Sequence, residues 1–121
     1  MIDIQRIREL SQRQSREHNI GLLGRAGKLT EEVGELWQEI LAYEHVQNYS
    51  ASASGTADKV VEEAVDVLIN CFDILDMLGA DDELINRVLR IKTQKWERKL
   101  NERKPISTAG LPQKKISYTW T

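Results

Sequence analysis

Proline is almost missing from the chain, and its absence leaves most of the sequence free to form helices. Of 121 residues only two are proline, Pro105 and Pro112. Proline disrupts a helix interior because it lacks an N–H group and its ring clashes with the preceding turn. Cysteine is equally scarce, and the single Cys71 excludes an internal disulfide and a cysteine-based zinc site. We therefore expect a helical chain up to Pro105.

The chain also lacks a strong net charge and a long apolar run. Its net charge of -2 gives no general attraction to nucleic acid polymers or to anionic membranes. No N-terminal segment resembles a signal peptide, and no stretch is apolar for long enough to span a bilayer. With 40% hydrophobic and 30% charged residues, the composition is typical of one soluble globular domain. We expect a cytoplasmic protein that binds neither a membrane nor a nucleic acid polymer.

Apolar residues at helical spacing predict an all-α fold. We expect a four-helix bundle within residues 1–104, with helices over residues 2–18, 26–46, 58–78 and 82–102, followed by a polar tail over residues 105–121. Three glycines between residues 19 and 27 predict a loop or a frayed helix start there. The second helix has one apolar stripe, which predicts its buried face: Leu29, Val33, Leu36 and Ile40. The third helix is apolar around more than half of its circumference, which predicts a central position and an oligomer.

The second and third helices each carry two carboxylates one turn apart. Glu32 and Glu35 share one face of the second helix, and Glu63 and Asp66 share one face of the third. Antiparallel packing would bring the four groups together, where like charges repel and raise one another's pKa values. A hard divalent cation offsets such repulsion through oxygen ligands. A single pair of this kind is usually a solvated surface, whereas two matching pairs favour Mg²⁺-assisted phosphate chemistry.

Four other polar residues are candidates for substrate contacts. Lys28 lies one turn before Glu32, where it can pair with that carboxylate or bind a phosphate. Asn70 lies one turn after Asp66 on an apolar helix, where an amide needs a partner such as a sugar, a base or a neighbouring backbone group. Lys95 and Arg98 continue the inner apolar stripe of the last helix, Leu84, Val88 and Ile91, and are candidate phosphate ligands. The alternative for both is a surface ion pair.

The two acidic segments resemble those of the MazG-type all-α nucleoside triphosphate pyrophosphohydrolases. The superfamily, which includes dimeric dUTPases and dCTP pyrophosphatases, is marked by EExxE and then, after a loop, ExxD. Here these motifs are KLTEEVGEL, residues 28–36, and EEAVDVL, residues 62–68. The resemblance implies that Mg²⁺, or Mn²⁺ in its place, is bound by Glu32, Glu35, Glu63 and Asp66. It also implies that Glu31 orients or activates water.

The activity that this resemblance implies is hydrolysis of a nucleoside or deoxynucleoside triphosphate to the monophosphate and pyrophosphate. Attack would occur at the α-phosphorus, and the role would be maintenance of the nucleotide pool. The resemblance further implies a homodimer or a homotetramer. A phosphoribosyl-ATP pyrophosphatase with similar helices is the alternative enzyme. A helical interaction module without catalysis is the alternative from another class, and it predicts no dependence on Mg²⁺.

Overall fold

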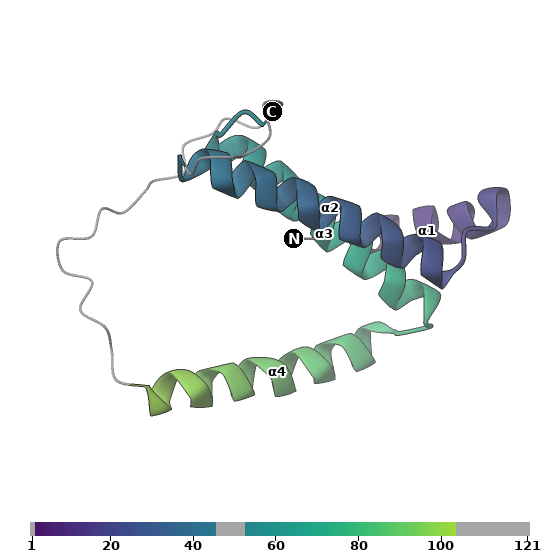
Figure 1. Ribbon diagram of the computed structural model, residues 1–121. Coiled ribbons are helices and arrows are strands. Elements are labelled where there is room, and N and C mark those ends of the chain that lie inside the picture. The colour runs from purple at the N-terminus through teal and green to yellow at the C-terminus, as the bar shows by residue number, and fades with distance from the viewer. Residues whose placement is uncertain (1, 46–52, 104–121) are drawn as a thin grey trace. The chain divides into compact units, whose positions relative to one another are not determined.

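The computed structural model describes residues 2–45 and 53–103. Within these residues the chain is all-α, with the helices α1 (Ile4–His18), α2 (Leu22–Tyr43), α3 (Ala57–Met77) and α4 (Asp82–Glu102) (Figure 1). The described residues up to Leu78 form one compact unit, and those from Gly79 onward form a second. The predicted tail, residues 105–121, lies outside the described residues.

Polar side chains fix the first residue of three helices. Asp3, Thr56 and Asp81 each accept a hydrogen bond from the backbone N–H three residues later, at 2.8 to 3.2 Å. These bonds satisfy N–H groups that have no partner within the first turn. Gly79 follows α3 with a φ of 75°, a conformation that glycine adopts without strain. Both ends of α3 and the start of α4 are therefore where the sequence predicts them.

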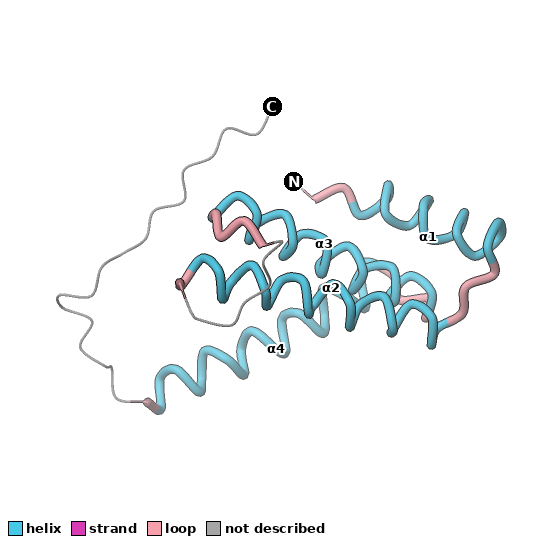
Figure 2. The backbone as a smooth tube through the Cα atoms, turned by 45° about the horizontal axis from the view of Figure 1, so that its top comes forward, coloured by secondary structure: helices cyan, strands magenta, loops and turns pink. Residues whose placement is uncertain are grey.

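The loop between α1 and α2 is shorter than its glycine content predicts (Figure 2). Because α2 already begins at Leu22, Gly24 and Gly27 lie inside the helix and not in a loop. Asn19 ends α1 with a φ of 50°, which asparagine tolerates better than most residues. A glycine costs a helix only about 1 kcal/mol relative to alanine. The contacts of the buried Arg25, described below, offset this cost.

Gly27→Ala should stabilise the protein by about 0.5–1 kcal/mol, because alanine favours the helix and a Cβ at this position meets no atom within 4 Å. Gly24 is the matched comparison. A Cβ there would lie 2.9 Å from Ile20 Cγ2, so Gly24→Ala should gain less or should destabilise. Urea unfolding of both variants measures the difference. Equal gains in the two variants would contradict the placement of Ile20 against Gly24.

The third helix, α3, packs against both α1 and α2. Figure 1 shows α2 and α3 side by side along much of their length. The prediction that this helix is central is confirmed for the first unit. Its apolar surface is only partly covered, since Val65, Leu68 and Ile69 remain exposed.

The buried face of α2 differs from the predicted one. Val33 of the predicted apolar stripe is 47% exposed, and none of the other three stripe residues is fully buried. The buried residues of α2 are instead Arg25, Glu32, Glu39 and Ala42, which recur every seven or three residues and so share one face. The predicted face is therefore correct only in part: Leu29, Leu36 and Ile40 are half-buried, while the most buried positions belong mainly to polar side chains. The carboxylates lie in the contact with α3, as the prediction of a shared site requires.

The fourth helix, α4, forms the described part of the second unit. Its predicted inner stripe of Leu84, Val88 and Ile91 shares one face, and no residue of α4 is buried. Lys95 and Arg98 lie further along the same helix. Among the described residues, no helix combines the length and the apolarity that crossing a membrane requires.

Candidate metal centre

Polar groups pair along the contact of α2 and α3 in reverse chain order. Arg25, near the start of α2, forms an ion pair with Asp73, near the end of α3. Glu39, near the end of α2, binds backbone groups that directly precede α3. The two helices therefore run antiparallel, as the prediction of a shared site requires. Between these two ends lie the carboxylates of both helices.

Three carboxylates converge at the middle of this contact. Glu32, Glu63 and Asp66 each offer one oxygen, and these oxygens all lie within 4.8 Å of one another. Glu32 and Glu63 are each only 7% exposed. Their Oε2 atoms are buried and have no hydrogen-bond partner. A buried charged oxygen without a partner is costly, so the protein gains when a cation supplies that partner.

The electrostatics of the neighbouring carboxyl groups support a concentrated negative charge. The charge of Glu32 raises the pKa of Glu35, with further contributions from burial and from Glu63. Burial raises the pKa of Asp66, and the charges of Glu32 and Glu63 raise it further. Glu35 is exposed and is not one of the three converging groups. It therefore borders the cluster, close enough to interact with two of its members.

Two lysines hold the outer oxygens of the buried glutamates. Lys28 Nζ lies 3.0 Å from Glu32 Oε1, and Lys59 Nζ lies 3.3 Å from Glu63 Oε1. Each hydrogen bond raises the pKa of its lysine. The contact of Lys28 with Glu32 is one of the two alternatives that the sequence left open. Sequence analysis missed Lys59, although it precedes Glu63 by the same four residues.

Glu31 and Glu39 flank the cluster on α2 without joining it. The Glu31 side chain is 60% exposed and lies 3.8 Å from Lys28 Nζ. Glu39 is buried, and both of its oxygens accept hydrogen bonds from Ser54 and Gly55 at 3.2–3.3 Å. Glu39 therefore anchors the segment that enters α3. The role of Glu31 with water stays a prediction.

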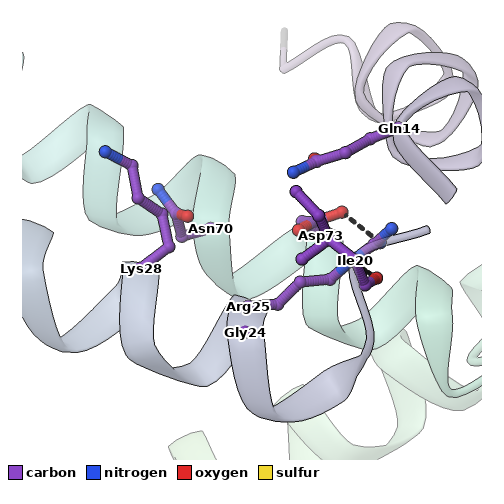
Figure 3. Close-up of a pocket in the computed structure, with 7 residues that line it drawn as sticks. All are labelled: Gln14, Ile20, Gly24, Arg25, Lys28, Asn70 and Asp73. Carbon is purple, nitrogen blue, oxygen red and sulfur yellow. Dashed lines mark hydrogen bonds and ion pairs between the residues drawn. The ribbon is translucent and has the colours of Figure 1, made fainter. Parts of the chain in front are cut away.

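A cavity of about 240 Å³ is lined by residues of α1, α2 and α3, among them Lys28 and Asn70, which lie one turn along their helices from Glu32 and Asp66 (Figure 3). Gln14 reaches it from α1, while Lys28 and Asn70 extend side by side from α2 and α3. Asn70 Nδ2 donates to the backbone oxygen of Asp66 at 2.7 Å, which accounts for one of its polar groups. Asn70 and Lys28 thus belong to both the cavity and the neighbourhood of the cluster, as their predicted roles require.

At the far end of the cavity, the buried Arg25 joins three helices. Its side chain is 1% exposed, and each of its five N–H groups has an acceptor. The acceptors are Asp73 Oδ1 at 2.7 Å, the hydroxyl and carbonyl oxygens of Ser11, Ser15 Oγ, and the carbonyl oxygen of Ile20. This network fixes α1 and the loop after it against α2 and α3. Sequence analysis did not identify it.

The predicted phosphate ligands Lys95 and Arg98 belong to α4 and therefore to the second unit. The cluster of Glu32, Glu63 and Asp66 lies in the first unit. The role of the two cations at this cluster accordingly stays a prediction.

Lowering the pH from about 7 to about 5 should raise the melting temperature of the protein in EDTA. The folded chain holds the protons of Glu35 and Asp66 more tightly than the unfolded chain, because both pKa values are raised. Their destabilising effect is complete above the folded pKa values and disappears as the pH falls through them.

The neutral variant Asp66→Asn is the comparison for this experiment. In EDTA at pH 7 it should melt at a higher temperature than the wild type, and its melting temperature should depend less on pH. Saturating Mg²⁺ should raise the wild-type melting temperature by mass action. An Asp66→Asn variant that melts lower than the wild type in EDTA would contradict the clustering of like charges.

The chain has no match among protein-family models, curated proteins or solved structures. The resemblance to MazG-type enzymes therefore rests on the two acidic motifs.

Proposed function

We propose that this protein is a Mg²⁺-dependent hydrolase that converts a nucleoside or deoxynucleoside triphosphate into the monophosphate and pyrophosphate. The observation that carries the proposal is the pair of buried, unpartnered oxygens, Glu32 Oε2 and Glu63 Oε2, in a cluster with Asp66. Oxygen-only ligand sets of this kind suit Mg²⁺, and Mn²⁺ accepts the same donors. The order of the two motifs along the chain supports the same activity.

The chemistry of the donors fits a divalent cation held by Glu32, Glu63 and Asp66, with Glu35 beside them. When bound, the cation neutralises substrate phosphates and lowers the pKa of a coordinated water. Glu31 is exposed beside Lys28, where its carboxylate is open to solvent and can accept a proton from the attacking water.

The cavity shown in Figure 3 is our proposed location for the base or the sugar of the substrate. A volume of about 240 Å³ suits a single ring system rather than a whole nucleotide. The Gln14 side chain reaches this cavity, and Asn70 lines it one turn beyond Asp66. Amide groups both donate and accept hydrogen bonds, as recognition of a sugar or a base requires. We assign Lys95 and Arg98 to the leaving pyrophosphate.

Oligomerisation is part of the same proposal. Val65, Leu68 and Ile69 on α3 and Trp37 on α2 expose apolar surface, which is costly in water. We propose that a second copy of the chain covers this surface in a homodimer or a homotetramer. Light scattering coupled to size-exclusion chromatography measures the mass, and a monomer at micromolar concentration would contradict this part.

The activity is tested by measuring pyrophosphate release from a panel of nucleoside and deoxynucleoside triphosphates, with Mg²⁺ and with EDTA. We expect release from at least one substrate with Mg²⁺ and none in EDTA. Phosphoribosyl-ATP belongs in the panel, because preference for it would identify the alternative enzyme. If no substrate released pyrophosphate, with Mg²⁺ or with EDTA, the result would favour an interaction module instead.

A further inference from the structure

Two lysines occupy equivalent positions on the two helices of the carboxylate cluster. Lys28 precedes Glu32 by four residues on α2, and Lys59 precedes Glu63 by four residues on α3. Each ammonium group pairs with the Oε1 atom of its glutamate, at 3.0 and 3.3 Å, and Lys28 Nζ also lies 3.8 Å from Glu31 Oε2. The Oε2 atom of each glutamate is left buried and without a hydrogen bond. Each glutamate thus has one oxygen held by a lysine and one available to a ligand.

Exposure separates the lysines from their partners. The side chains of Lys28 and Lys59 are 52% and 39% exposed, whereas those of Glu32 and Glu63 are both 9% exposed. The lysine side chains therefore reach solvent, whereas the carboxylates that they contact are buried. A phosphate group that comes from solvent to these carboxylates also comes close to two positive charges. Lys28 also lines the adjacent cavity, which places it beside the space for the rest of the substrate.

A bound cation would change what these lysines neutralise. Without a cation, they are the positive groups in contact with Glu32 and Glu63. A divalent cation at the unpartnered oxygens supplies that neutralisation itself, and it weakens the attraction between each lysine and its glutamate. A flexible lysine side chain with a half-exposed stem can then turn toward another anion at little cost.

We propose that Lys28 and Lys59 exchange partners during binding, from the carboxylates of Glu32 and Glu63 in the metal-free protein to substrate phosphates once the cation is bound. The inference adds Lys59 to the phosphate-binding residues. Lys28 pairs with Glu32 before the cation binds and with a phosphate afterwards, so the two roles that the sequence left open are successive states of one side chain. It rests on the proposed function only in taking the ligand to be a polyphosphate.

The test uses Mg²⁺ and inorganic tripolyphosphate, so that neither base preference nor turnover enters the measurement. Calorimetric titration gives the affinity for Mg²⁺ alone and then the affinity for tripolyphosphate at saturating Mg²⁺. The variants are Lys28→Met and Lys59→Met. Arg13→Met is the matched control, because Arg13 also pairs with a glutamate four residues away, but both partners are exposed.

Each lysine variant should bind Mg²⁺ as tightly as the wild type or severalfold more tightly, since a competing positive charge is removed. It should bind tripolyphosphate about tenfold more weakly, the loss expected for one charge-assisted contact. Arg13→Met should change neither affinity. Lys59→Arg, which keeps the charge, should retain most of the tripolyphosphate affinity and provides a second check if Lys59→Met folds poorly.

Three results would overturn the exchange. Weaker Mg²⁺ binding in the lysine variants would mean that the lysines position the carboxylates. Unchanged affinities for Mg²⁺ and tripolyphosphate would mean that the contacts of Lys28 and Lys59 are only surface ion pairs. If the wild-type protein bound Mg²⁺ but no tripolyphosphate, the lysines would have no phosphate partner and no exchange could occur. If the wild type binds both ligands but hydrolyses no nucleotide, the proposed function fails, while the variants still decide the exchange.

Discussion

Glu63→Gln should lower pyrophosphate release by about a thousandfold or more. The substitution keeps the shape of a residue that is 7% exposed, but it removes one of the two charges whose oxygens lack a partner. Metal ions stabilise a transition state by several kcal/mol, and each 1.36 kcal/mol corresponds to about tenfold in rate. Loss of the cation therefore removes most of the rate enhancement. Steady-state kinetics on the best substrate of the nucleotide panel measures the loss.

Glu62→Gln is the matched control, because it makes the same chemical change one residue away on an exposed position of α3. It should retain most of the activity. Calorimetry should show that Glu63→Gln loses Mg²⁺ affinity, and circular dichroism should show that it keeps its helix content. Equal rates in Glu63→Gln and Glu62→Gln would mean that Glu63 is not part of the metal site.

Arg25→Ala should destabilise the protein by about 3–5 kcal/mol, the usual effect of breaking a buried ion pair. The substitution leaves the Asp73 carboxylate buried without its cation, and it removes the donors to Ser11, Ser15 and the Ile20 carbonyl. Arg25 is 1% exposed, so in the wild type its partners are bonded to the guanidinium group and shielded from bulk water. Urea unfolding, followed by circular dichroism, measures the change in the free energy of unfolding.

Two further variants show whether the pair itself matters. Arg13→Ala removes an exposed ion pair and should cost less than about 1 kcal/mol. Replacing both partners, as in Arg25→Met with Asp73→Leu, should recover much of the lost stability, because no buried charge is left unpaired. An Arg25→Ala variant as stable as Arg13→Ala would contradict the network that joins α1 to α2 and α3.

The helices and the carboxylate positions were predictable because they depend on local signals. Caps such as Thr56 and Asp81 and the glycine at Gly79 define helix ends through groups within one turn. The spacing of Glu63 and Asp66 places both on one helix face in any fold. The antiparallel contact with α2 then brings the carboxylates of the two helices together.

The buried face of α2 was not predictable from hydrophobicity. Arginine and glutamate are rarely buried unless they are paired, so hydrophobicity alone does not place Arg25 and Glu32 in a contact between helices. Their burial depends on partners distant in sequence, above all Asp73 and Glu63, which only the packing of α3 supplies. Lys59 was not predicted for another reason. Its four-residue spacing to Glu63 is common on helices, and it indicates a role at the site only once Glu63 is known to be buried.

Hydrolysis in ¹⁸O-labelled water, with the products resolved by ³¹P nuclear magnetic resonance, shows which phosphorus atom the water attacks. With Mg²⁺, we expect one labelled oxygen to enter the nucleoside monophosphate and none to enter pyrophosphate, because water attacks the α-phosphorus. We also expect Glu63→Gln to form neither product under the same conditions. Label in pyrophosphate or orthophosphate, or unchanged product formation by Glu63→Gln, would contradict the proposed mechanism.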